Sequence, residues 1–293
     1  MSGTDSHGHH GHHGHHHHHH HGAGASASGQ NKDYFNELAS TYDSRHGKTL
    51  DKLVEEIRAR VDFLGVDWAD DDDEGDDDGN NDKEREEKKK AESAEAAEKK
   101  TVRLLDYACG TGVVNPLILT YLSQALAPYT TQCVGIDLSE NMVATYNARA
   151  ENQGLTASEM HAYQGNLCVP EDPNPALLAS PEFTNFDIAA VGLGFHHFDD
   201  PKLAARRLAE RLKVGGVLMI LDFLPHEKAD ASHPAASTIT HHGFTEDHIR
   251  QIYEEAGMGK DFALQEMAVV FHFSRETETE VKRRLFLARG TKA

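Results

Sequence analysis

The 293-residue chain has only three cysteines and one tryptophan, and it has fewer basic than acidic residues. Three is an odd number and too small for a disulfide scaffold, which predicts a reducing, cytoplasmic compartment. No apolar run approaches the roughly 20 residues of a membrane span, so no membrane partner is expected. With 29 Lys and Arg against 48 Asp and Glu, the net charge is −19. This balance excludes a general nucleic-acid binder, because phosphate backbones are bound by clustered cations.

The histidines are concentrated at the start of the chain. Twelve of the 22 lie between His7 and His21, interleaved with glycines. A tract without apolar periodicity cannot bury surface, so residues 1–30 are predicted to be a disordered tail or affinity tag, with 26–30 a flexible linker. Loose chelation of zinc, nickel or copper is the alternative. The stretch 1–22 lacks the apolar core of a secretory signal.

The acidity is also localised, in residues 67–100. This segment holds 16 acidic and seven basic residues, which accounts for −9 of the −19. Self-repulsion predicts a disordered insert, and the spacing of an EF-hand calcium loop is not met. A basic protein is the partner that such a segment would suit.

Outside these segments the chain alternates short β-rich runs with amphipathic stretches. Residues 31–66 carry two apolar stripes at helical spacing, and Thr101 begins a region of alternating strands and helices. Strands are expected at 102–107, 133–136, 159–163, 186–191 and 217–223, and helices at 113–126, 140–152, 201–212 and 245–255. Two further β-rich runs, 263–273 and 281–288, have no helix between them. The order predicts an α/β, doubly wound, mainly parallel sheet with an antiparallel C-terminal edge strand and N-terminal helices.

The turn after the first strand carries the chemistry. It reads D-Y-A-C-G-T-G from Asp106 to Gly112, and the second strand ends at Asp137, 25 residues beyond Gly112. Glycines allow close backbone approach to a ligand, and a carboxylate after the second strand can accept ribose hydroxyls. The dinucleotide pattern G-x-G-x-x-G is not met, because Asn115 stands at the third position. Asp106 would repel a pyrophosphate but suit an ammonium, so the expected ligand is an adenosine that carries an amino acid.

Five motifs in order then resemble the class I S-adenosylmethionine-dependent methyltransferases. They read L-L-D-Y-A-C-G-T-G, V-G-I-D-L-S, G-N-L, F-D-I-A-A-V-G-L-G-F-H-H-F and L-K-V-G-G-V-L-M-I-L-D-F. The resemblance implies a Rossmann-like sheet of seven strands over residues 101–293. It also implies S-adenosylmethionine as cofactor, with S-adenosylhomocysteine as product. Residues 31–66 resemble the helical lid of the members that act on small molecules.

The resemblance assigns cofactor contacts by position. The methionine moiety would lie beside Asp106, Ala108, Cys109, Gly110 and Gly112, with Ala108 in place of a glycine that is common there. Asp137 would hold the ribose. The adenine would meet Leu138, Met142, Asn166 and Leu167, with Asn166 where many members have Asp. Gly192 would lie near the sulfonium, and Tyr42 near the cofactor carboxylate.

Three histidines are candidate catalytic residues. His196 and His197 follow the fourth strand, and His242 lies on the same rim after the fifth. Methyl transfer is governed by proximity and orientation, and a base is needed only when the nucleophile must lose a proton. For His196 and His197 the alternative is ordinary packing as neutral rings, and for His242 it is a place in a loop near a helix start.

Cys109 is expected to have a lowered pKa if a helix N-terminus faces its thiol. No metal site is predicted, because the chain has neither a cysteine cluster nor an H-E-x-x-H spacing.

The predicted function is therefore methyl transfer to a small organic acceptor. The fourth motif is V-G-L-G and not the N-P-P-Y type found in enzymes that methylate planar amides and exocyclic amines. Together with the lack of a basic patch, this disfavours DNA and RNA substrates. A protein methyltransferase whose acidic insert docks a basic tail is one alternative, and a non-catalytic scaffold with the cofactor fold is another.

Overall fold

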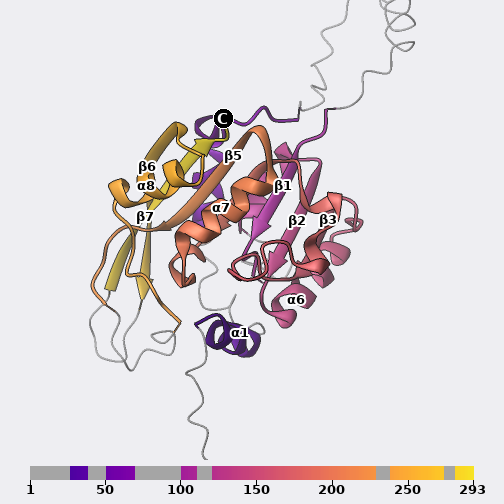
Figure 1. Cartoon of the computed structure of the whole chain (residues 1–293), viewed down its shortest axis with the longest axis horizontal. Coiled ribbons are helices and arrows are strands. Elements are labelled where there is room, and N and C mark those ends of the chain that lie inside the picture. Colours follow the sequence, from indigo (N-terminus) through magenta and orange to yellow (C-terminus); the bar gives the residue numbers. More distant parts are fainter. Residues whose placement is uncertain (1–26, 39–50, 70–99, 111–120, 229–237, 274–280) are drawn as a thin grey trace, which may run out of the picture.

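The computed structural model describes residues 27–38, 51–69, 100–110, 121–228, 238–273 and 281–293 (Figure 1). These residues form a seven-stranded sheet with the order β3-β2-β1-β4-β5-β7-β6. The strands are β1 (Arg103–Tyr107), β2 (Gln132–Asp137), β3 (Met160–Gln164), β4 (Phe186–Gly192), β5 (Leu212–Phe223), β6 (Lys260–Phe273) and β7 (Val281–Thr291). Strands β1 to β5 are parallel, and β7 is antiparallel to both β5 and β6. The predicted fold class is confirmed, with β7 one place in from the edge because β6 lies outside it.

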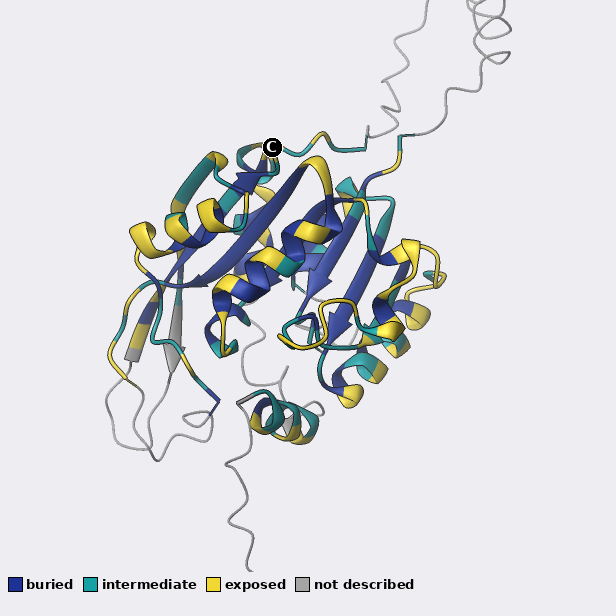
Figure 2. Cartoon of the chain, in the orientation of Figure 1, coloured by how far each residue is buried: buried dark blue, intermediate teal, exposed yellow. Residues whose placement is uncertain are grey.

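The central strands are buried on both faces, as expected for parallel strands covered by helices. In β4, every residue from Phe186 to Val191 is buried. Alternate side chains divide between two hydrophobic clusters, so that Ile188 belongs to one and Ala189 to the other. In Figure 2 the central strands are mostly buried, and many exposed residues lie on the outer faces of the helices.

Helices cover both faces of the sheet. The cluster of Ile188 includes side chains from α5 (Tyr121–Leu126) and α6 (Glu140–Asn152). The opposite cluster, around Ala189, includes side chains from α7 (Pro201–Arg211) and α8 (Glu246–Glu255). Figure 1 shows α7 crossing the front of the sheet. The short 3-10 helices are η1 (Ala127–Tyr129), η2 (Ala176–Leu178), η3 (Pro181–Phe183) and η4 (Phe195–His197).

Side-chain caps fix where the helices begin. Ser139 accepts a hydrogen bond from the N–H of Met142 at the start of α6, and Thr245 accepts one from His248 at the start of α8. Such caps satisfy donors that have no partner within the helix. The observed starts agree with the helices expected at 140–152 and 245–255. The first part of the predicted helix 113–126 lies outside the described residues.

The N-terminal region differs from its prediction. The helix α1 (Ala27–Leu38) begins at Ala27, so the assignment of 26–30 to a flexible linker is wrong from residue 27 onward. Contacts with the domain accompany this early start, since Ser28 Oγ donates to Asp199 at 3.3 Å.

The stretch 51–64 packs into the hydrophobic core of the domain. Residues 51–58 are helical, and α3 (Val61–Leu64) follows. Leu53, Ile57 and Leu64 are fully buried in the cluster of Ile188, which also contains Leu287 of β7. The segment proposed as a lid, 31–66, therefore contains a core-forming part, whereas the residues of α1 do not belong to the core clusters.

The acidic segment begins and ends at one place on the surface. An ion pair joins Asp67 to Lys100, and the Trp68 ring lies 5.7 Å from that of Tyr129. Residues 70–99 lie between these points, outside the described part of the chain. Closing a longer surface loop costs little extra entropy, which explains how a long segment is accommodated here. No helix in the described ranges has the length and apolar character to cross a membrane.

Truncation of Ile57 to alanine tests the core assignment of residues 51–64. We expect the free energy of unfolding to fall by about 2–5 kcal/mol, because a fully buried side chain is replaced by a cavity. The matched control is Glu55→Ala on the exposed side of the same helix, which should cost no more than about 0.5 kcal/mol. Equal effects of the two substitutions in urea unfolding would contradict this packing.

Candidate functional site

The site lies where the strand order reverses. In the sheet, β1 is followed by β2 on one side and by β4 on the other, which creates a switch point at their carboxyl ends. Ligands of open parallel sheets bind in the crevice at such points. The sequence motifs end here, so the loops after β1, β2 and β4 build the site.

The loop after β1 has a left-handed backbone at two positions. The φ angles are 58° at Ala108 and 61° at Gly110. A Cβ at Gly110 would meet no atom of the described residues within 4 Å, so with respect to these residues the backbone is open to a ligand. Ala108 adopts the conformation that favours the glycine common at this position, and its Cβ lies 3.0 Å from a Cβ built on Gly194 of the β4 loop. The two loops therefore touch at the switch point.

Asp137 joins the loops after β1 and β2. Its Oδ2 accepts the Gly110 N–H at 2.8 Å, and its Oδ1 accepts the Ser139 N–H at 2.9 Å. Burial raises the pKa of Asp137, and the two N–H groups oppose that rise by stabilising the carboxylate. An ionised carboxylate has further lone pairs, so Asp137 can still accept two ribose hydroxyls. Asp137 and the open backbone of Gly110 thus fit an adenosine ligand.

Asp106 lies below the surface of this site. It is 1% exposed and accepts a hydrogen bond from Ser123 Oγ at 2.7 Å. Ser123 also lies 3.1 Å from the Tyr146 hydroxyl and 3.2 Å from Cys133 Sγ, within the same buried polar group. This group anchors α5 and α6 to β1 and β2. A direct contact from Asp106 to the methionine amine stays a prediction.

The Cys109 thiol is buried and is not activated by a lowered pKa. Its side chain is 6% exposed and lies in the core, where Sγ would be 2.9 Å from a Cβ at Gly135. Burial raises the pKa of this thiol well above its ordinary value, and the nearby carboxyls of Asp137 and Asp106 raise it further. A glycine at position 135 leaves room for the sulfur, so Cys109 contributes packing and its backbone to the loop.

Tyr107 orders the turn after β3. Its hydroxyl donates to Asn166 Oδ1 at 3.3 Å and accepts the Leu167 N–H at 3.0 Å. Asn166 Oδ1 also accepts the Cys168 N–H at 2.8 Å. The turn assigned to the adenine edge is therefore fixed by a tyrosine of β1 that the sequence analysis did not single out. Its place within the D-Y-A-C-G-T-G turn was the available signal.

The remaining predicted cofactor positions fall into three groups. Leu138 is half-buried and Met142 is 2% exposed at the start of α6, beside Asp137. Gly192 ends β4, where a Cβ would meet the Tyr121 hydroxyl at 2.0 Å, so this tyrosine of α5 requires a glycine there. Tyr42 and Gly112 lie outside the described residues.

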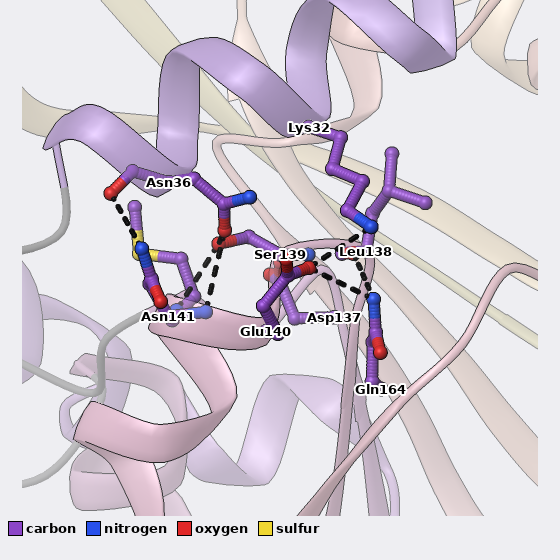
Figure 3. A network of polar contacts seen from close by, with 9 residues as sticks. Lys32, Asn36, Asp137, Leu138, Ser139, Glu140, Asn141 and Gln164 are labelled. Carbon is purple, nitrogen blue, oxygen red and sulfur yellow. Dashed lines mark hydrogen bonds and ion pairs between the residues drawn. The ribbon is translucent and has the colours of Figure 1, made fainter.

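The helix α1 is fastened to the start of α6, directly above Asp137 (Figure 3). Asn36 Oδ1 accepts hydrogen bonds from Ser139 Oγ and, at 3.3 Å, from the Asn141 N–H. Asn141 Nδ2 donates in return to the Asn36 carbonyl at 3.1 Å. Because Ser139 also binds Asp137, the helix and the carboxylate belong to one network.

A second set of contacts holds the same side of α1. Lys32 Nζ lies 3.0 Å from Glu140 Oε2, which also accepts a hydrogen bond from Gln164 Nε2 at 3.0 Å. Gln164 Nε2 further lies 3.2 Å from the Leu138 carbonyl. These groups are exposed, so salt screens the ion pair, and the Asn36 contacts are the more specific part of the attachment.

The other side of α1 contacts the β4 half of the site. Asn31 Nδ2 donates to the His197 carbonyl at 3.0 Å, and the rings of Phe35 and His197 are 5.2 Å apart, edge to face. The helix therefore spans from the β2 loop to the β4 loop, across the switch point.

His196 is held in the core by a carboxylate. It is 4% exposed, its Nδ1 lies 2.8 Å from Asp222 Oδ1, and its N–H donates to Asp222 Oδ2 at 3.0 Å. Burial would raise the pKa of Asp222, but His196 and the backbone N–H groups outweigh it and hold that pKa below its ordinary value. Asp222, at the end of β5, is a residue that the sequence analysis missed, although it stands within the fifth motif.

His197 is neutral in the folded protein. Its Nδ1–H donates to the Thr238 carbonyl at 2.7 Å, and its ring lies 4.1 Å from that of His196. Burial and the neighbouring His196 lower its pKa from 6.5 to about 3. Donation through Nδ1 leaves Nε2 with a free lone pair in the neutral ring.

His242 and its neighbour His226 have enclosed ring nitrogens. The rings lie 5.9 Å apart, and the His226 N–H donates to the His242 carbonyl at 3.1 Å. His242 Nδ1 and His226 Nε2 are buried and have no hydrogen-bond partner within the part of the chain that the structure describes. His226 lies in the loop after β5 and was not predicted, because its neighbours in space are distant in sequence.

The lowered pKa of His197 predicts an acid-sensitive fold. The unfolded state binds a proton below about pH 6.5, whereas the folded state resists it down to about pH 3. Stability is therefore complete above pH 6.5 and falls as the pH drops through this window, by up to about 1 kcal/mol per unit. His197→Asn, whose amide can still donate to Thr238, should flatten this dependence in unfolding measured between about pH 5 and pH 7. An unchanged slope would contradict the neutral state of His197.

Comparisons with known proteins identify the family. A family model for a methyltransferase domain matches residues 52–259, most of the chain. An uncharacterized methyltransferase of Schizosaccharomyces pombe is 28% identical over 206 residues, which cover 67% of this chain and 68% of that protein. The demethylmenaquinone methyltransferase of Thermus thermophilus is 31% identical over 133 residues, 45% of this chain and 52% of that enzyme.

Two solved structures share the fold. An S-adenosylmethionine-dependent methyltransferase of Thermotoga maritima has a TM-score of 0.51 and 15% identity, over 89% of this chain and 99% of that one. A complex of the Haloferax volcanii Trm112 activator with a methyltransferase has a TM-score of 0.53 and 16% identity, and the match covers 88% of this chain and 96% of that one. At these identities the likeness shows the fold alone. The chain therefore belongs to the methyltransferase domain family and has the class I fold of the S-adenosylmethionine-dependent enzymes.

Proposed function

We propose that this methyltransferase acts on a small organic acceptor that binds between α1 and the carboxyl ends of β4 and β5. The observation that carries the proposal is the position of α1, which bridges the β2 and β4 loops through Asn36 and Asn31. A helix in this position would cover an acceptor bound beneath it and shield it from water. A site covered in this way would suit a small molecule better than a segment of a protein chain.

The cofactor side of the site is assigned to the loops after β1 and β2. S-adenosylmethionine supplies an activated methyl group on a sulfonium when bound. In our proposal Asp137 and Gly110 hold the ribose and the adjoining chain, and Leu138 and Met142 flank the adenine. Asn166 and Leu167 close the adenine edge, in the turn fixed by Tyr107.

The acceptor side is assigned to the histidines after β4 and β5. We propose that His196, locked by Asp222, positions the η4 turn, and that His197 presents a neutral ring to the acceptor space beside Phe35. His242 would contact the acceptor from the loop after β5. Orientation of the acceptor toward the methyl group is the main contribution that these residues make to the rate.

Replacement of Asp137 tests the cofactor assignment. Asp137→Ala should weaken binding of S-adenosylhomocysteine at least about tenfold in calorimetry, because charged hydrogen bonds to the ribose are lost. Asp247→Ala, an exposed carboxylate of α8, is the control for the loss of one negative charge. Circular dichroism should show that both variants are folded. An affinity equal to that of the wild type would refute the ribose assignment.

Removal of residues 70–99 distinguishes a small acceptor from a protein substrate. The ends of this segment meet at the Asp67–Lys100 pair, so a short glycine-serine linker can replace it without strain. We expect the shortened protein to methylate small molecules of a cell extract as the full chain does. A protein substrate docked by the acidic segment would instead lose its methylation in the shortened form, and labelling of proteins alone would refute the proposal.

A further inference from the structure

A cluster of imidazoles that the cofactor site does not use lies around the last residue of β5. We define this β5 histidine cluster as His196, His226 and His242. The His196 ring lies 5.1 Å and the His226 ring 5.7 Å from the ring of Phe223, the last residue of β5. The His242 ring lies 5.9 Å from that of His226. The cluster thus stands at the carboxyl end of β5, on the acceptor side of the switch point.

His226 has the geometry of a general base. Its Nδ1 lies 2.8 Å from the Glu227 carbonyl, which can only accept, so Nδ1 carries the proton. Its Nε2 therefore holds a lone pair in the neutral ring. That nitrogen is buried and has no hydrogen-bond partner among the described residues, so it can accept from a donor on the acceptor.

The surroundings of His226 are positively charged. Burial lowers its pKa, the hydrogen bond to Glu227 opposes this, and Arg283 of β7 lowers it further, together with His196 and His242. The same guanidinium and Lys228 act on His242. Arg283 also lies over the Phe223 ring, with Cζ 5.5 Å from its centroid. His226 is thus neutral, in a field that favours an anion beside it.

The carboxylate at this end of β5 is already engaged. Asp222 accepts hydrogen bonds from the ring and the N–H of His196 and from the N–H of Phe223. It is fully buried. Among the described residues, the charges that act on His226 and His242 are those of Arg283, Lys228 and the other imidazoles, and no carboxylate is among them, which disfavours an ammonium acceptor.

We propose that the acceptor is a hydroxyl compound, a phenol or an enol, and that His226 Nε2 removes its proton. The inference rests on the proposed function, since it names the acceptor class of that site. The O–H bond breaks, its electron pair stays on oxygen, and an N–H bond forms at Nε2. The oxygen then takes the methyl group, while the electrons of the C–S bond remain on sulfur. The imidazolium returns its proton to water after the transfer.

Two features favour oxygen as the methylated atom. A neutral amine already has a free lone pair and needs no base, and a thiol, with a pKa of about 8.5, is already partly ionised near neutral pH. A phenol or an enol is protonated at that pH and gains from a base and from a nearby cation. Arg283 would stabilise the oxyanion that forms beside His226.

The first part of the test identifies the methylated atom. The full chain is incubated with S-adenosylmethionine labelled with carbon-13 at the methyl group, and with the small molecules of a cell extract. The carbon shift of the transferred methyl group distinguishes oxygen from nitrogen, sulfur and carbon. We expect oxygen. Small products labelled at another atom would overturn this inference and leave the proposed function intact, whereas labelling of proteins alone, or of nothing, would overturn both.

The second part tests His226 with the product found in the first. His226→Gln should lower kcat at least about 100-fold near pH 7. The logarithm of kcat should then rise with pH with a slope of about one, because the variant depends on acceptor molecules that are already ionised. The control is His241→Gln, a histidine of the same rim whose Nε2 lies 3.1 Å from the Phe198 carbonyl, and it should keep the wild-type rate and pH profile.

A readout independent of turnover completes the test. In protein labelled with nitrogen-15 at histidine, the Nε2 resonance of His226 should shift when the identified acceptor is added with S-adenosylhomocysteine. A His226→Gln variant that is folded and keeps the wild-type kcat and pH profile would overturn the assignment. So would a His226 resonance that stays unchanged at saturating acceptor.

Discussion

The active site depends on the Asp137 carboxylate, which binds the N–H groups of Gly110 and Ser139 at once. Each bond joins Asp137 to a different loop, so one side chain sets the relative position of the turns after β1 and β2. The cost of burying that charge is offset by the two donors. Without them the left-handed turn at Gly110 would have no fixed place above the sheet. The ligand site follows from this arrangement.

The same residue couples the cofactor half to α1. Ser139 donates its N–H to Asp137 and its hydroxyl to Asn36, so the helix rests on the residue that caps α6. At its other side α1 meets His197 through Asn31 and Phe35. One helix thus contacts both loops. The residues that it meets there lie more than 100 positions later in the chain.

Regular features of this fold were predictable because they depend on local sequence. The alternation of strands and helices, the cap at Ser139 and the Asp137 position after β2 follow from propensity and spacing. The orientation of Cys109 and the positive φ of Ala108 were not predictable, because both are decided by tertiary packing, against Gly135 in the first case. Tyr107, Asp222 and His226 were missed for a related reason. Asp222 lies 26 positions from the His196 that it holds, and Tyr107 lies 60 from Leu167.

We propose Asp137 as the ribose anchor of an S-adenosylmethionine site at the β1–β2 rim. A crystal structure of the full chain with S-adenosylhomocysteine tests this assignment most directly. We expect both ribose hydroxyls within hydrogen-bond distance of the Asp137 carboxylate, with the Gly110 and Ser139 contacts retained and α1 above the ligand. A nucleoside bound elsewhere, or with its ribose turned away from Asp137, would contradict it.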